Sequence, residues 1–226
     1  MDIEQARTTM IAQQIRPWQV FDHAVLDILA RVHREDFVPP TQRAYAFMDL
    51  QIPLHEPADE ARAKGQVMLE PRVEARLLLE AAVQPSDRVL EIGTGSGYMA
   101  ALLAQQAREV VTLEIEPTLV QAARVNLERC GIGNVRVRQG DAAAFAGTTE
   151  KPFDVIVFSG SVPELPEDFL KLLTPAGRLI AVIGEEPIMR TTVIQRRGDK
   201  TVRSEPWDVL IPPLIGFTRP AVPHAA

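Results

Sequence analysis

The glycine-rich stretch VLEIGTGSGYMAALLA, at residues 89–104, is the part of the sequence best suited to chemistry. An apolar run typical of a buried strand leads directly into Gly93, Gly95 and Gly97, and a helical pattern follows. Glycine has no Cβ, so the backbone can turn sharply and a ligand can approach main-chain atoms closely. The stretch therefore predicts a cofactor site. A tight turn that binds nothing is the alternative, for which three alternate glycines would be excessive.

The spacing of the glycines and a nearby acid indicate which cofactor is bound. A dinucleotide-binding turn reads G-x-G-x-x-G, whereas here the third glycine comes one residue early and Tyr98 stands in its place. A P-loop is excluded because no glycine-lysine pair followed by serine or threonine is present. Glu91 precedes Gly93 by two residues, where a carboxylate can bind the ammonium of a methionyl group, directly or through water. The pattern favours S-adenosylmethionine over a nicotinamide dinucleotide.

Two further acids follow the next two apolar runs. Glu114 lies 21 residues after Gly93, at the end of VVTLE, where its carboxylate can hold two ribose hydroxyls; a solvated charge beside Glu116 is the alternative. Asp141, in RQGDAAAF, could bind the amino group of adenine, with the amide of Ala142 at a ring nitrogen. Acids at the ends of three successive strands predict a crevice at the carboxyl edge of a sheet.

The elements that must position these residues alternate along the chain. Apolar residues at helical spacing predict helices over residues 3–15 and 22–32, whereas residues 37–64, rich in proline and charge, indicate a long ordered loop with one short strand. Beyond that loop, short apolar runs alternate with amphipathic stretches, which is typical of a parallel sheet covered by helices. The expected strands are residues 88–92, 109–113, 135–138, 154–158, 178–183, 191–196 and 201–210, the last two joined by a hairpin turn at 197–200; the expected helices are residues 73–83, 98–106, 117–130 (ended by Gly131) and 166–173.

Composition excludes several classes of protein. The chain has 226 residues, 46% of them hydrophobic, which suits one globular domain with a sizeable core. A net charge of −6 argues against binding nucleic acid through its phosphates. No apolar run is long enough to span a membrane and no leader pattern is present, so we expect no membrane association. One cysteine, Cys130, fits the reducing cytoplasm, and no Cys/His cluster indicates a metal.

The sequence resembles the protein L-isoaspartate O-methyltransferase family over roughly residues 5–215. The similar segments are MIAQQI, VLDILARVHREDFVPP, GQVMLEP, VLEIGTGSGY, ARVNLERCGIGNVRVRQGD and PFDVIVFSGSVPELPEDFLKLLTPAGRLIAVIG. The glycine-rich segment is shared by many methyltransferases, whereas the combination of REDFVPP with a following GQ and a later proline is much more specific to this family.

The resemblance implies an α/β, Rossmann-like class I methyltransferase fold: a doubly wound, mostly parallel seven-stranded sheet with its last two strands antiparallel. We expect a helical extension with a substrate-side loop over residues 1–84, the cofactor-binding domain over 85–215 and a tail over 216–226. S-adenosylmethionine would be the cofactor and S-adenosylhomocysteine the product. The residues expected around the cofactor are Gln66, Glu91, Gly93, Thr94, Gly95, Ser96, Gly97, Tyr98, Glu114, Ile115, Asp141 and Ala142.

One segment departs from the family pattern. Family members read GQTIS before a proline, and the serine is taken to contact the carboxylate of the substrate; here Val67 replaces the threonine and Leu69 replaces that serine. Val67, Met68 and Leu69 are therefore expected in the substrate pocket, and the catalytic residue is unknown. A lost hydrogen bond costs about 0.5 to 1.5 kcal/mol, and a carboxylate facing leucine also loses solvation.

We therefore expect an S-adenosylmethionine-dependent methyltransferase, similar to carboxyl O-methyltransferases, with altered or lost isoaspartyl specificity. Its acceptor would be a protein, a peptide or a small molecule. An ionised carboxylate needs no general base for methyl transfer, so the lack of an obvious base does not argue against an enzyme. The alternatives are a non-catalytic cofactor-binding protein, a genuine isoaspartyl repair enzyme and a nicotinamide oxidoreductase. Arg62, Lys64 and Arg72 flank the altered segment and could pair with an anionic substrate, but solvated loop charges are the favoured interpretation. His23, His33 and His55 are expected at the surface or at helix caps.

Overall fold

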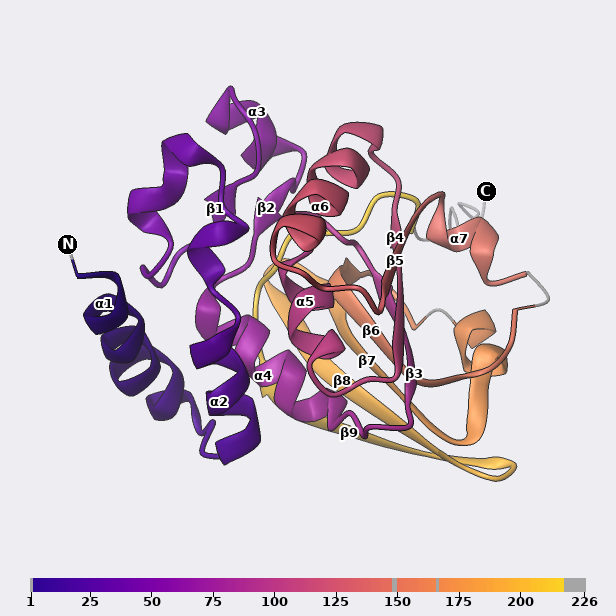
Figure 1. Cartoon of the computed structure of the whole chain (residues 1–226). Coiled ribbons are helices and arrows are strands. Elements are labelled where there is room, and N and C mark those ends of the chain that lie inside the picture. Colours follow the sequence, from indigo (N-terminus) through magenta and orange to yellow (C-terminus); the bar gives the residue numbers. More distant parts are fainter. Residues whose placement is uncertain (1, 148–149, 166, 218–226) are drawn as a thin grey trace.

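The computed structural model describes residues 2–147, 150–165 and 167–217. Its centre is a seven-stranded sheet in the order β5-β4-β3-β6-β7-β8-β9, with helices on both sides (Figure 1). The sheet confirms the expected doubly wound class I methyltransferase fold. The strands are β3 (Arg88–Ile92), β4 (Glu109–Glu114), β5 (Val135–Gln139), β6 (Phe153–Val162), β7 (Leu173–Glu185), β8 (Ile188–Arg197) and β9 (Lys200–Asp208).

The strand order reverses beside β3, and this reversal places the site. Strand β3 pairs in parallel with β4 on one side and with β6 on the other, with Ile92 opposite Leu113 and Phe158. In an open α/β sheet, ligands bind outside the carboxyl ends of the strands at such a reversal. The glycine-rich turn follows Ile92 directly, so it lies at that position.

The far edge of the sheet is antiparallel. Strand β8 runs against β7, and β9 runs against β8 with Arg197 opposite Lys200, so the expected hairpin at residues 197–200 is confirmed. The last two strands are antiparallel to each other, as the resemblance implies, and β8 alone runs against the direction of the parallel strands. Strands β6 and β7 are longer than predicted. Their outer parts carry glycine and polar residues, so the apolar runs mark only the central part of each strand.

Two hydrophobic cores cover the two faces of the sheet. On one face, side chains such as Val89 and Ile180 pack against α4 (Pro71–Ala81), α5 (Tyr98–Ala104) and α6 (Pro117–Arg129). On the other face, their neighbours Leu90 and Leu179 pack against the short α7 (Ala142–Phe145) and the segment 167–172. The alternation of successive strand residues between two covered faces explains why the strands are apolar on both sides.

The N-terminal extension lies beside the sheet, on the side away from α7 (Figure 1). Helix α1 (Ile3–Met10) continues through a wider turn to residue 15, and α2 (His23–Arg31) begins where Asp22 Oδ1 accepts a hydrogen bond from the Val25 amide. Both expected helices are therefore present. Their buried residues belong to the same core as α4 and α5, so the extension is packed onto the sheet domain.

Two expectations about irregular segments need correction. The loop over residues 37–64 contains a helix, α3 (Ala58–Ala63), besides the short strand β1 (Ile52–Pro53), which pairs with β2 (Val67–Met68). Pro57 before the helix and two acids in its first turn are start signals that the high proline content obscured. The expected helix over residues 166–173 is a 3₁₀ segment over 167–172, and Pro166 lies outside the described residues, as do residues 218–226 of the expected tail.

Among the described helices, none combines the length and the apolar character that crossing a membrane requires.

Candidate active site

A cleft of about 640 Å³, including its part open to solvent, lies at the carboxyl ends of β3 and β4. The turn after β3 forms its floor: the Gly93 amide donates to the Leu113 carbonyl oxygen at 2.9 Å, and the Gly97 amide donates to that of Thr94 at 2.8 Å before α5 begins. The residues lining the cleft are Leu54, Lys64, Gly65, Gln66, Val67, Ile92, Gly93, Gly95, Leu113, Glu114, Ile115, Leu119, Gly140, Ala142, Ser159, Pro213, Leu214 and Ile215.

The turn requires glycine at its first position. Gly93 has a φ of +90°, which L side chains rarely adopt, and a Cβ added there would lie 2.7 Å from Leu214 Cδ2. A side chain at this position would strain the backbone and would require Leu214 to move. This close approach also leaves main-chain atoms of the turn bare toward the cleft.

Glu114 joins the end of β4 to this turn. Its Oε2 accepts a hydrogen bond from the Gly95 amide at 2.9 Å, and its Oε1 accepts one from the Glu116 amide at 3.0 Å. The side chain is buried and lines the cleft next to Ile115. Carboxylate oxygens accept more than one hydrogen bond each, so Glu114 can also receive hydroxyl groups from a ligand.

Glu91 is completely buried and is bound by hydroxyl groups. Its Oε2 accepts a hydrogen bond from Thr112 Oγ1 at 2.7 Å, and its Oε1 accepts one from Ser159 Oγ at 2.9 Å. Burial raises the pKa of Glu91 to about 8, although the two hydrogen bonds oppose that shift. Ser159, which directly follows an expected strand, and Thr112, a polar residue inside the apolar run VVTLE, were not identified from the sequence.

Two other expected residues lie at the rim of the cleft. Gln66 is buried and lines the cleft, with its Oε1 2.5 Å from Nε2 of His55; His55 is thus half-buried beside the site rather than a surface residue. The Asp141 side chain caps α7 by accepting from the Ala143 amide at 2.9 Å. The cleft wall there consists of the two neighbours of Asp141 in the sequence, which are Gly140 and Ala142.

A second, smaller cavity of about 310 Å³, including its part open to solvent, adjoins the cleft. The two share Val67, Gly93, Gly95 and Ser159, and the structure brings all three residues of the altered segment, Val67 to Leu69, into the smaller one. Its wall consists of Val67, Met68, Leu69, Glu74, Glu91, Gly93, Thr94, Gly95, Ser96, Tyr98, Met99 and Ser159. We call it the acceptor cavity, after the expectation that residues 67–69 face the methyl acceptor.

A buried arginine holds the altered segment in place. Arg34 Nη2 donates to the Leu69 carbonyl oxygen at 2.5 Å, Nε donates to that of Ala46 at 2.9 Å, and Nη1 pairs with Glu74. The guanidinium also lies 5.2 Å from the centroid of the Tyr98 ring. Arg34 and Glu74 were missed in the sequence, although Arg34 begins the narrow REDFVPP motif. Two of the basic residues that flank the altered segment pair with acids: Lys64, which also lines the cleft, with Glu60, and Arg72 with Asp49.

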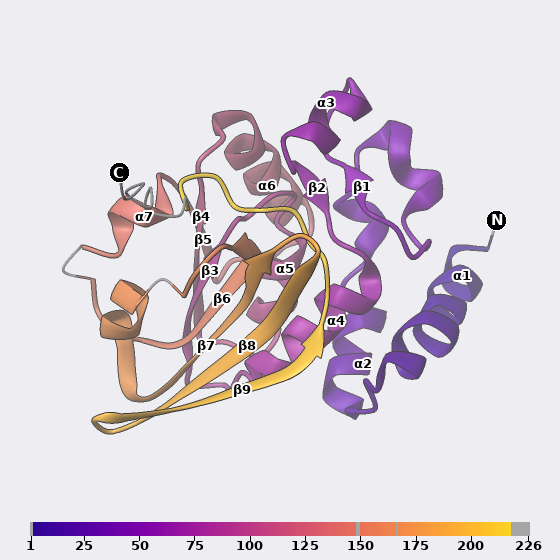
Figure 2. The same ribbon diagram turned by 180° about the vertical axis from the view of Figure 1, so that it is seen from behind.

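The C-terminal strap, residues 209–217, forms a further wall of the cleft, with Leu214 next to Gly93 of the turn. The Ser161 amide donates to the Pro212 carbonyl oxygen, and the Leu214 amide donates to that of Ser161, both at 2.9 Å. Figure 2 shows the strap leaving β9 and crossing the carboxyl ends of the strands toward α7. The sequence indicated strand up to residue 210 and a tail from 216, so this wall of the cleft was not expected.

The comparisons with known proteins decide the family. A family model described as protein-L-isoaspartate(D-aspartate) O-methyltransferase matches residues 5–215. The chain belongs to this family. A protein-L-isoaspartate O-methyltransferase of Koribacter versatilis is 35% identical over 93% of this chain and 90% of its own length. The one from Gloeobacter violaceus is 36% identical over 91% and 96%.

Solved structures of the family agree on the fold. A protein-L-isoaspartate O-methyltransferase structure superposes with a TM-score of 0.76 at 23% identity, covering 95% of this chain and 66% of its own. A Plasmodium falciparum structure in complex with S-adenosyl-L-homocysteine superposes with a TM-score of 0.73 at 19% identity, covering 95% and 98%. Membership of the family confirms the expectation of an S-adenosylmethionine-dependent methyltransferase.

Proposed function

We propose that this methyltransferase acts on an acceptor other than the isoaspartyl carboxylate named in the descriptions of its relatives. The observation that supports the proposal is Leu69, which is 5% exposed and lines the acceptor cavity where the family pattern has a serine. Its carbonyl oxygen is fixed by Arg34, so the segment cannot shift easily to offer another donor. A carboxylate in this cavity would meet leucine and methionine, at a desolvation cost of a few kcal/mol.

The residues of the cleft fit the cofactor. In the described part of the chain, Glu91 receives hydrogen bonds from hydroxyl groups and no ion pair, so an ammonium group of the ligand would find a buried carboxyl to pair with. Glu114 would hold the ribose hydroxyls and Ala142 would contact adenine. The other cofactor contacts proposed are those of Gln66, the turn from Gly93 to Tyr98, Ile115 and Asp141.

The cofactor supplies an electrophilic methyl group when it is bound. The chain's contribution is to orient the acceptor and to exclude water, because displacement at the methyl carbon requires alignment of the two reacting atoms. Val67, Met68 and Leu69 supply the apolar wall that does this. The names of the relatives support the competing reading, that of an isoaspartyl methyltransferase, and the missing hydroxyls oppose it.

A methylation assay with labelled cofactor and an isoaspartyl peptide tests the proposal. We expect slow or no turnover of the peptide by the wild-type protein, and rapid turnover would overturn the proposal. The double variant Val67→Thr with Leu69→Ser should raise turnover at least about 10-fold, equivalent to about 1.4 kcal/mol. The matched control is Val67→Thr with Leu69→Ala, which opens similar space without the second hydroxyl and should not raise turnover.

Titration with S-adenosylhomocysteine distinguishes a protein that binds the cofactor without catalysing methylation from a variant whose cleft is damaged. If the ligand binds but no carboxylate, amine or hydroxyl in a broad acceptor screen is methylated, the protein is a non-catalytic cofactor-binding protein and the proposal is wrong. Loss of binding in a variant shows instead that the substitution damaged the cleft.

A further inference from the structure

A second buried carboxyl, that of Glu74 on α4, lines the acceptor cavity. The side chain is 4% exposed, and Arg34 binds its Oε2 atom. In the described part of the chain its other oxygen, Oε1, makes no hydrogen bond. Oε1 is also not fully enclosed by protein, because it is absent from the set of completely buried side-chain atoms that have no partner. Since buried polar atoms are nearly always paired, Oε1 is available to a group that enters the cavity.

Glu74 is held in a fixed position relative to the altered segment. Arg34 donates to Glu74 and, through its other terminal nitrogen, to the Leu69 carbonyl oxygen. The same side chain is anchored to Ala46 and lies over the Tyr98 ring. Such support on rigid elements is what places a side chain accurately enough for proton transfer. Glu74 therefore has a fixed position in the wall of the acceptor cavity, next to the altered segment.

The acceptor cavity is acidic. Glu74 and Glu91 both line it, whereas no lysine, arginine or histidine is among the described residues of its wall. The Tyr98 residue also lines it, and the Tyr98 hydroxyl is buried without a hydrogen-bond partner in the described structure. An uncharged acceptor with its own N–H or O–H would find Glu74 Oε1 as a hydrogen-bond acceptor in this wall.

We propose that the acceptor is a neutral amine or hydroxyl group and that Glu74 accepts the proton which this group loses on methylation. In the step, a bond forms between the acceptor nitrogen or oxygen and the methyl carbon, the carbon–sulfur bond breaks with its electrons passing to sulfur, and the acceptor's proton moves to Glu74 Oε1. The proton returns to solvent once the product has left. This inference rests on the proposed function, because an isoaspartyl carboxylate has no such proton to give.

The protonation state of Glu74 suits this role. Burial raises the pKa of Glu74 to about 7, and Arg34 opposes the shift while Glu70 adds to it. Glu91 on β3 and Tyr98 on α5 also interact electrostatically with Glu74. A general base works best when its pKa is near the working pH, because it is then both ionised and able to take a proton.

The test compares Glu74→Gln with the wild-type protein on amine, hydroxyl and carboxylate acceptors. We expect turnover in the amine or hydroxyl arm, a loss of kcat of at least about 100-fold in Glu74→Gln, and loss of the rise in kcat near pH 7. The affinity for S-adenosylhomocysteine should stay within threefold. Glu80→Gln on the same helix is the matched control, since Glu80 pairs with Arg76 outside the cavity, and its kcat should be unchanged.

A carboxyl titration gives a readout that does not depend on turnover. With ¹³C-labelled glutamate, NMR should show one carboxyl that titrates near pH 7 and that is absent from Glu74→Gln. A Glu74 carboxyl that remains ionised down to pH 5, or an unchanged kcat in Glu74→Gln, would overturn the role of Glu74 alone. Efficient methylation of the isoaspartyl peptide would overturn the proposed function as well, so the two failures can be told apart.

Discussion

The Gly95 amide donates a hydrogen bond to Glu114 Oε2 at 2.9 Å, which joins the turn after β3 to the end of β4. The same carboxylate accepts from the Glu116 amide. One side chain therefore fixes two backbone segments that belong to different strands. The cleft is organised by this contact before a ligand arrives, which reduces what binding must spend on ordering the protein.

Glu114→Ala should weaken the binding of S-adenosylhomocysteine at least about 10-fold. The variant loses two hydrogen bonds to a charged group, each contributing about 1.5 to 3 kcal/mol, and it loses the carboxylate proposed for the ribose. Isothermal titration calorimetry measures the change. Glu116→Ala serves as the control, because Glu116 contacts Thr118 at the start of α6 and is not part of the cleft wall. Equal affinities of the two variants would contradict the prediction.

Gly93→Ala should damage both stability and ligand binding. The new Cβ would lie 2.7 Å from Leu214 Cδ2, and the φ of +90° adds strain on the order of 1 to 3 kcal/mol. Urea denaturation with and without S-adenosylhomocysteine measures both effects. In Gly133→Ala, by contrast, the added Cβ meets nothing within 4 Å, so we expect wild-type binding and a change of stability within about 1 kcal/mol.

The stability of the ligand-free protein should fall as pH rises from about 4.5 to about 8. Burial raises the pKa of Glu74 to about 7 and that of Glu91 to about 8, above the value of 4.5 in an unfolded chain. The folded protein then keeps protons that the unfolded chain has lost, so this stabilisation is full below pH 4.5 and is lost as pH rises through 7 and 8. At about 1.4 kcal/mol per pKa unit, the loss is on the order of several kcal/mol.

Urea denaturation at pH 5.5, 7 and 8.5 checks this dependence. Glu91→Gln has no proton to lose at that position, so its stability should fall less over the same range. Saturating S-adenosylhomocysteine should also reduce the fall, because its ammonium group would stabilise the ionised form of Glu91. A wild-type stability that rises from pH 5.5 to 8.5, or a Glu91→Gln variant with an identical profile, would contradict the prediction.

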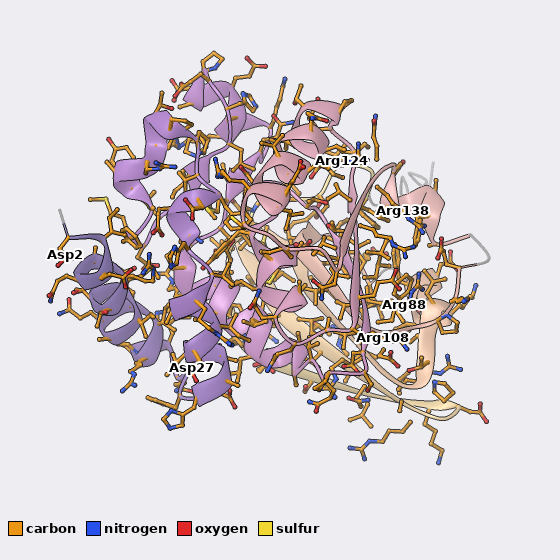
Figure 3. The ribbon with its side chains drawn as sticks, in the orientation of Figure 1. Asp2, Asp27, Arg88, Arg108, Arg124 and Arg138 are labelled. Atoms are coloured by element: carbon orange, nitrogen blue, oxygen red, sulfur yellow. The ribbon has the colours of Figure 1, made fainter. Side chains whose placement is uncertain are left out.

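Arg88→Met should destabilise the fold without affecting the ligand. Arg88 begins β3, at the opposite end from the turn, and donates to Glu109 at 3.1 Å, Glu150 at 3.1 Å and the Lys151 carbonyl oxygen at 2.6 Å. Figure 3 labels it on the side of the molecule away from Asp2 and Asp27. We expect a loss of about 1 to 3 kcal/mol by urea denaturation and an unchanged affinity for S-adenosylhomocysteine. The exposed Arg108 provides the control substitution, Arg108→Met.

The parts of the site that could be predicted are those encoded locally. The glycine turn, Glu91 and Glu114 each follow an apolar run directly, so their place at the edge of the sheet follows from the strand pattern. Arg34 and Glu74 could not be found in this way, because their pairing joins residues 40 positions apart and nothing local marks a charged residue as buried. The strap was missed for the same reason: its contacts with Ser161 join distant parts of the chain.

The expected division of the chain at residue 84 stays a prediction, as does a cytoplasmic location. The core of the N-terminal extension is continuous with that of the sheet domain, which a boundary drawn from composition could not reveal. Helix α3 was missed for a different reason: its start signals are local, but the surrounding prolines indicate a loop.

Pro213, Leu214 and Ile215 line the cleft, yet a ribosome adds them after every strand of the main sheet. During synthesis the nascent chain can therefore pair its strands before the last wall of the cleft exists. The cleft has all of its described walls only once translation has passed residue 215. A truncated product that ends before residue 209 would keep the sheet but leave the adenosyl compartment open on one flank, and retention on an adenosyl-bearing resin would separate complete molecules from incomplete ones.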